Sequence, residues 1–157
     1  MNRDVLQVLP SGETGYPEAH RLLRQLEGSL RKLIEESLSG LSPTWWTARI
    51  PEDVRENAER RKEKDDMQWP WATGANLHPI HYVDFPHYVK IIRRKDNWRE
   101  IFARIFHDEE LVSSKLRELE PIRNALAHSR PLPKNGLIRL RINAKDILAL
   151  LPPAKLQ

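Results

Sequence analysis

Three residues in the C-terminal third of the chain, Arg123, Asn124 and His128, have side chains and a spacing suited to chemistry on a phosphate group. A guanidinium binds phosphate through paired hydrogen bonds and stabilises negative charge that develops on it. An imidazole accepts and releases a proton near neutral pH, as a general acid or base must. Asn124 and His128, four residues apart on a helix, share one face, so the amide can orient the imidazole. These three are the candidate catalytic residues.

The helix that carries these residues constrains where their side chains point. By ideal helical phase Arg123 lies within an apolar stripe that includes Ile122 and Leu126. A buried charge without a partner costs several kcal/mol, so Arg123 needs a crevice, an anion or a second subunit. Arg123 and His128 are about 140° apart around an ideal axis. A kink at Pro121, the reach of a long side chain or a second copy of the helix would bring both to one phosphate.

Other chemistries lack their motifs, and no metal or cofactor is expected. The chain has no cysteine, Gly-rich phosphate loop, serine nucleophile elbow or His-Glu-x-x-His motif. His78, His81 and His87 lie near Asp84, but Pro79 disfavours a rigid helical pair of histidine ligands.

Basic residues outside the motif are candidates for further phosphate contacts. The chain has 26 Lys and Arg against 22 Asp and Glu, a net charge of +4 and a pI near 9.5, which slightly favours a polyanionic partner. Arg130 follows the motif directly, and Arg93, Arg94 and Lys95 form a cationic run. The segment from Glu52 to Asp66 holds more basic residues, but its mixed signs are typical of a solvated helix face.

The elements that must position these residues are predicted to be helices. The apolar spacing indicates an all-α bundle of about five to six helices, over residues 17–39, 52–66, 84–92, 98–106, 108–129 and 144–151. Helix 17–39 is expected to form core or dimer interface, and residues 69–81 a loop. Asp84, Asn97 and Asn143 are expected to cap the helices that follow them. We expect a flexible lead-in over residues 1–16 and one domain over residues 17–157.

The same sequence suggests where the protein acts. The lack of cysteine fits a reducing compartment. The first residues have no secretory signal pattern, and no apolar run is long enough to cross a bilayer. We therefore expect a cytoplasmic protein without a membrane partner.

The segment from Leu119 to Arg130, LEPIRNALAHSR, resembles the signature helix of the HEPN superfamily (higher eukaryotes and prokaryotes nucleotide-binding), in which an arginine and a polar residue precede a histidine by a few positions. The similar group occurs in stand-alone prokaryotic proteins, in abortive-infection proteins and at the C-terminus of a yeast RNA endonuclease. Three more motifs resemble that group, namely Pro43-x-Trp45-Trp46, Ile50-Pro51-x-Asp53-Val54 and Trp98-x-x-Ile101-Phe102-x-x-Ile105-Phe106. The resemblance covers about residues 41–133, and Pro121 departs from the usual pattern.

The resemblance implies a homodimer whose two motif helices line a shared cleft that takes RNA. In active members it implies cleavage without metal that leaves a cyclic phosphate. His128 would then handle the proton of the ribose 2′-OH or of the leaving group, Arg123 would bind the phosphate, and Asn124 would hold His128 in place. The candidate RNA-binding residues are Arg130, which directly follows the motif, and the cationic run of Arg93, Arg94 and Lys95.

Three interpretations stay open on the sequence alone. Arg123 and His128 could brace the helix without a further role. The chain could be a non-catalytic HEPN module that binds RNA, a nucleotide or a protein partner. It could also be a metal-independent endoribonuclease of a defence, toxin-antitoxin or RNA-processing system, with an antitoxin or another protein as a further partner.

Overall fold

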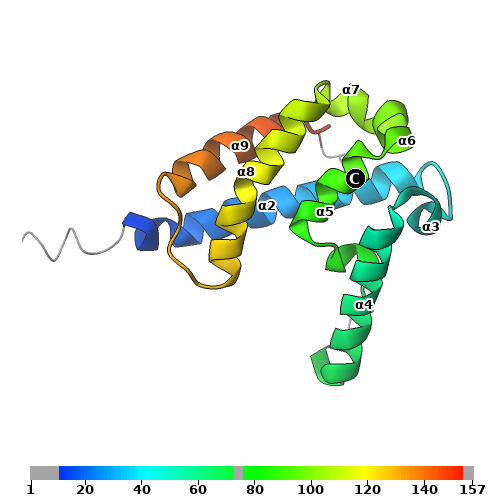
Figure 1. The fold of residues 1–157 in the computed structure, drawn as a ribbon, viewed down its shortest axis with the longest axis horizontal. Coiled ribbons are helices and arrows are strands. Elements are labelled where there is room, and N and C mark those ends of the chain that lie inside the picture. The colour runs from blue at the N-terminus through cyan, green and yellow to red at the C-terminus, as the bar shows by residue number, and fades with distance from the viewer. Residues whose placement is uncertain (1–10, 73–75, 154–157) are drawn as a thin grey trace, which may run out of the picture. The chain divides into compact units, whose positions relative to one another are not determined.

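The computed structural model describes residues 11–72 and 76–153, and no strand occurs within these ranges (Figure 1). The all-α prediction is therefore confirmed. The elements in chain order are α2 (Ser11–Ser39), α3 (Trp45–Arg49), α4 (Glu52–Gln68), η1 (Pro70–Ala72), η2 (Pro79–Tyr82), α5 (Phe85–Arg93), α6 (Lys95–Asn97), η3 (Trp98–Phe102), α7 (Ala103–Phe106), α8 (Glu109–Ala127) and α9 (Gly136–Leu150).

The helices form two compact units. The first unit combines the chain up to Gly28 with the chain from Glu110 onward, so it holds the N-terminal part of α2 together with α8 and α9. The second unit runs from Ser29 to Glu109. The prediction of one domain over residues 17–157 stays a prediction.

Helix α2 has the apolar face that its spacing predicts. Its buried residues recur every three or four positions, as Ala19, Leu23, Leu26, Leu30, Ile34 and Leu38. The helix ends at Ser39, directly before Gly40, as expected. It begins at Ser11 rather than at Pro17, so residues 11–16 of the expected lead-in are helical. Residues 1–10 lie outside the described part of the chain.

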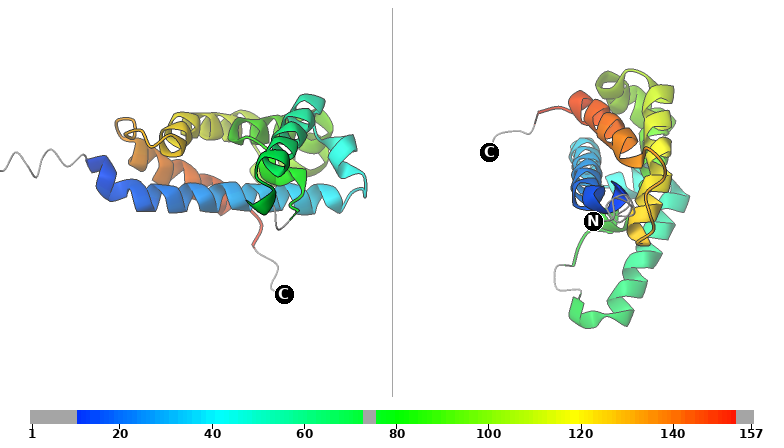
Figure 2. Two further views of the ribbon diagram at one scale, coloured as in Figure 1. Left: turned by 90° about the horizontal axis from the view of Figure 1, so that it is seen from below. Right: turned by 90° about the vertical axis from the view of Figure 1, so that its left-hand side faces the viewer.

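Ion pairs connect the three helices of the first unit, whose ribbons Figure 2 shows from two further sides. Helix α8 bonds to α9 through Lys115 and Asp146, whose charged atoms lie 2.8 Å apart. Arg141 of α9 forms a bidentate pair with Glu18 of α2, at 2.6 and 2.7 Å. Because these pairs are exposed, each contributes little to stability by itself, but together they join one helix to two others.

Helix α9 begins earlier than predicted, and Asn143 does not cap it. The helix starts at Gly136, with Asn135 at the N-cap position in the left-handed region at a φ of 60°. Asn143 lies inside the helix, where its buried amide donates a 2.8 Å hydrogen bond to Glu118 of α8. The prediction was wrong because it treated the amide as a local cap, whereas its acceptor lies on another helix.

Asn97 was likewise expected to cap a helix, and that prediction was also wrong. The helical run begins at Lys95 and continues through α6, the π-helical turn η3 and α7 to Phe106. The fully buried Asn97 amide donates to the carbonyl oxygens of Arg49 and Ile91, at 2.8 and 2.9 Å. Asn97 therefore ties three segments of the second unit together.

The second unit contains an aromatic cluster of Trp45, Trp46 and His78. The His78 ring stacks on Trp45 and meets Trp46 edge-on, with ring centroids 5.0 Å apart in both pairs. Its Nδ1 accepts a 3.0 Å hydrogen bond from the Ile80 amide and so caps η2. The predicted loop over residues 69–81 thus contains two short 3₁₀ helices.

Helices α4 and α5 follow their predictions closely, whereas the short helix α3 was not predicted. Helix α4 is mostly exposed and buries only Val54 and Ala58, as its charged sequence indicates. Asp84 is the N-cap of α5 by position, although its side chain makes no capping hydrogen bond. The Asp84 carboxylate instead pairs with Arg61 at 3.2 Å.

We predict that lowering the pH destabilises the second unit through His78. Burial lowers the pKa of His78, Glu35 opposes that shift, and His81 adds to it. The unfolded chain then binds the proton at a higher pH than the folded chain. The contribution of His78 to the free energy of unfolding is therefore fully present above about pH 6.5, and it is lost as the pH drops below that value.

Urea unfolding followed by tryptophan fluorescence between pH 7 and 5 measures this loss. His78→Asn should reduce it, because an Asn side chain can still accept the Ile80 hydrogen bond but does not titrate. Burial also lowers the pKa of His81, so His81→Asn should reduce the loss as well. An unchanged pH dependence in His78→Asn would contradict the prediction.

Candidate functional site

The candidate residues lie at the C-terminal end of α8, and two different faces of the helix carry them. Ile122, Ala125 and Leu126 are buried beside Arg123. Residues 114, 117, 121, 124 and 128, which repeat every three or four positions, are exposed. Asn124 and His128 therefore belong to a solvent-facing stripe, whereas Arg123 lies next to the buried face.

Pro121 belongs to the exposed stripe, and this position explains how the helix tolerates a proline away from its ends. Helix α8 runs from Glu109 to Ala127 with Pro121 inside. Proline removes the hydrogen bond to the carbonyl of the residue four positions earlier, which is Arg117. Because Arg117 is exposed as well, solvent can satisfy that carbonyl.

Arg123 has the crevice that its charge requires. Its side chain is 28% exposed, and its Nε lies 3.8 Å from a carboxylate oxygen of Glu27 on α2. A groove of about 240 Å³ opens beside this pair, and it is lined by His20, Leu23, Arg24, Glu27, Arg123, Leu126 and Ala127. The partner of the Arg123 charge is thus a carboxylate of the same compact unit, with room for a ligand beside it.

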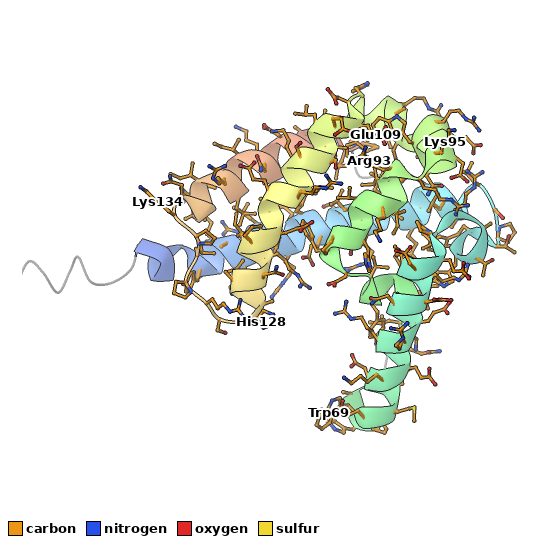
Figure 3. All side chains as sticks on the ribbon, viewed as in Figure 1. Trp69, Arg93, Lys95, Glu109, His128 and Lys134 are labelled. Carbon is orange, nitrogen blue, oxygen red and sulfur yellow. The ribbon has the colours of Figure 1, made fainter. Side chains whose placement is uncertain are left out.

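His128 does not line this groove. It is exposed at the end of α8, where Figure 3 labels it. Its backbone amide donates a 3.1 Å hydrogen bond to the Asn124 carbonyl, which is the last helical bond of α8. The structure therefore brings Asn124 and His128 to one face, as predicted, but does not bring Arg123 and His128 to one point within a single chain.

A Schellman motif ends α8 and fixes the backbone at His128. Ser129 adopts a left-handed φ of 52°. Its amide donates to the Leu126 carbonyl at 3.4 Å, and the Arg130 amide donates to the Ala125 carbonyl at 2.8 Å. The Arg130 carbonyl in turn accepts a 3.4 Å hydrogen bond from the Tyr16 hydroxyl. The main chain of Arg130 is thus part of the cap, while its side chain is exposed.

The predicted cationic run belongs to the second unit, and acids neutralise two of its three members. The Arg93 Nε lies 2.9 Å from Glu109, and Figure 3 labels both residues together with Lys95. The Arg94 Nε lies 3.1 Å from Asp96. Lys95 is exposed. Of this run, Lys95 is best placed to contact a phosphate without first breaking one of these pairs.

Residues 11–72 and 76–153 contain no group of three or more His, Asp or Glu side chains arranged to hold a metal ion. Of the three histidines weighed as ligands, His78 instead packs against two tryptophans and accepts a backbone hydrogen bond. In the same described part, no helix is both long and apolar enough to span a membrane.

Sequence reasoning assigned α2 to core or interface and missed the three polar residues that it contributes to the groove. His20, Arg24 and Glu27 repeat at four and three positions, so they form one polar line beside the buried face. That spacing was visible in the sequence. Which helix the line faces depends on tertiary packing, for which the sequence carried no signal.

The family model described as Swt1-like HEPN matches residues 21–151, which is most of the chain. The chain belongs to the HEPN superfamily. The matched region of this HEPN chain begins within α2 and ends directly after α9, so it includes α8 and the part of α2 from residue 21 onward, while His20 lies outside it. The comparison with curated proteins found no match, and neither did the comparison with solved structures.

We predict that Ser129→Gly stabilises the HEPN chain by about 0.5–1 kcal/mol, because glycine adopts the left-handed conformation without the steric cost that serine has. Part of this stabilisation is offset by the greater backbone freedom of glycine in the unfolded state. Thermal unfolding followed by far-UV circular dichroism measures the change. Ser114→Gly is the matched control, and it should destabilise the protein because Ser114 is exposed within α8. A lower midpoint for Ser129→Gly would contradict this account of the cap.

Proposed function

We propose that this HEPN chain is a metal-independent endoribonuclease that acts as a homodimer through α8. The observation that carries the proposal is the position of Arg123, whose guanidinium is partly exposed in a groove and lies beside the Glu27 carboxylate. A purely bracing arginine has no need of open space beside it. An arginine that binds a phosphate does.

The proposed reaction follows from the two side chains. The ribose 2′-oxygen attacks the adjacent phosphorus, the bond to the 5′-oxygen breaks, and a cyclic phosphate and a 5′-hydroxyl result. His128 takes the proton from the 2′-OH or gives one to the leaving oxygen. Arg123 stabilises the negative charge that grows on the phosphoryl oxygens. Asn124, on the same exposed stripe, orients the imidazole.

A dimer is part of the proposal because one chain does not aim both groups at the same atom. Arg123 lines the groove beside α2, and His128 is exposed on the stripe that also holds Asn124 and Pro121. A two-fold axis beside this stripe would place His128 of one protomer near Arg123 of its partner. Each dimer would then contain two equivalent composite sites.

A non-catalytic HEPN module that binds RNA, a nucleotide or a protein is the second candidate. The pairing of Arg123 with Glu27 favours it, because a neutralised guanidinium has less charge to offer a reacting phosphate. Defence, toxin-antitoxin or RNA-processing roles, and an antitoxin as partner, fit either candidate. Cleavage separates the two.

We predict that the wild-type protein cleaves a mixed RNA pool in the presence of EDTA and that His128→Ala and Arg123→Ala each lower the rate by roughly 10²-fold or more. Gel analysis of the products, with tests for 2′,3′-cyclic phosphate ends, measures this. His107→Asn and Arg21→Ala are matched controls, because each removes the same residue type at an exposed position outside the site. Inactivity of a folded wild type, or equal activity in all variants, would favour the binding module.

We further predict that activity returns when the two inactive chains share one dimer. Arg123→Ala and His128→Ala chains, co-expressed with different affinity tags and purified through both, should have about half the wild-type rate, because one of the two composite sites keeps both residues. If the mixed dimer is as inactive as its parents, the two residues act within one chain and the composite site is wrong.

A further inference from the structure

The groove beside Arg123 contains two more groups that can donate hydrogen bonds to an anion, and both come from α2. Resting on the function proposed above, we infer that His20 and Arg24 bind the phosphodiester backbone of single-stranded RNA together with Arg123. The inference starts from the composition of the groove. Of its seven lining residues, two are arginines, one is a histidine and one is an acid.

The charge balance of the groove favours an anionic occupant. Arg24 and Arg123 contribute two positive charges and Glu27 one negative charge, so the net charge is +1 with His20 neutral. No carboxylate of the described residues lies within ion-pair distance of Arg24. This differs from Arg139 and Arg141 of the same unit, which pair with Glu118 and Glu18. Arg24 thus has a charge for a ligand to neutralise.

The spacing on α2 places the two donors side by side. His20 and Arg24 are four residues apart on one helix face, and both are exposed. Glu27 follows by three residues and holds the Arg123 guanidinium from the opposite helix. A phosphate placed between Arg24 and Arg123 can accept from two guanidinium groups, which bind phosphate with two parallel hydrogen bonds each.

The walls of the groove suit a sugar next to that phosphate. Leu23 and Leu126 are 8% and 7% exposed, and with Ala127 they are the apolar residues of the lining. A volume of about 240 Å³ exceeds that of a phosphate group alone. Leu126 and Ala127 also lie between Arg123 and His128 in the chain, so a strand that occupies the groove continues toward the end of α8 where His128 is exposed.

Glu27 has a definite part in this arrangement. In the structure its carboxylate accompanies Arg123, and a phosphate that enters the groove competes with it for the guanidinium. The carboxylate therefore keeps Arg123 in place before RNA binds and weakens RNA binding by repulsion. Removing its charge while keeping its shape should strengthen binding.

The test is RNA binding by the His128→Ala protein, which keeps the groove but lacks the proposed proton-transfer group. Fluorescence anisotropy of a labelled 12-nucleotide RNA gives the dissociation constant at several salt concentrations. We predict that Arg24→Ala weakens binding by about 5- to 10-fold and makes the slope of log K against log salt shallower by about 0.7, the value for loss of one phosphate contact on a single strand. His20→Ala should weaken binding by a smaller factor, and Glu27→Gln should strengthen it.

Arg21→Ala in the same background is the matched control. Arg21 is an exposed arginine on α2 that does not line the groove. If Arg21→Ala changes the salt slope as much as Arg24→Ala, or if Arg24→Ala changes nothing, the inference is overturned. Weaker binding by Glu27→Gln would overturn the competition between Glu27 and phosphate. Circular dichroism confirms that each variant is folded.

Competition separates an RNA strand from a free phosphate compound. Unlabelled RNA should displace the label at micromolar concentration, while 5 mM AMP or inorganic phosphate should not. If AMP displaces the label as readily as RNA does, the groove is a site for mononucleotides and the inference fails. If RNA binding depends on Arg24 but the wild type does not cleave RNA, the groove is supported as an RNA-binding site and the endoribonuclease is rejected. If the wild type cleaves RNA but RNA binding does not depend on Arg24, the endoribonuclease is supported and the groove is rejected as the RNA-binding site.

Discussion

The first unit must accommodate the charge of the Arg123 guanidinium, which lies next to the buried residues of α8, and its other features depend on this constraint. Full burial of that charge without a partner would cost several kcal/mol. The unit avoids this cost in two ways, by leaving 28% of the side chain exposed and by placing Glu27 of α2 beside it. Both solutions keep the α2 and α8 helices from closing completely over Arg123. The groove is the space that results.

The structure at the end of α8 likewise depends on where backbone polar groups find hydrogen-bond partners. The Schellman motif turns the chain at Ser129 although no glycine is present, and the Tyr16 hydroxyl bonds to the carbonyl of the next residue. His128 is therefore the last residue before a fixed turn and is not part of a fraying helix end. Pro121 belongs to the same exposed stripe, where its missing hydrogen bond faces solvent.

The resemblance of residues 119–130 to a known signature helix predicted the family, whereas periodicity predicted the all-α class and the positions of α2, α4 and α8, because each of these helices has a regular apolar stripe or a regular lack of one. The need of Arg123 for a crevice followed from its charge, but the identity of Glu27 as partner did not. Asn97 and Asn143 were misassigned for one reason. A buried amide whose acceptor lies on another segment has the same local sequence as a helix cap.

The distribution of tryptophan makes the two compact units optically distinct. All five tryptophans lie between residues 45 and 98, within the second unit, while the unit that holds the candidate site has none. Intrinsic fluorescence therefore reports on the second unit, whereas circular dichroism reports on the helices of both. The two unfolding midpoints coincide if both units unfold in one cooperative transition, and they differ if the units unfold separately. A single tryptophan introduced into α9 would give the first unit a signal of its own.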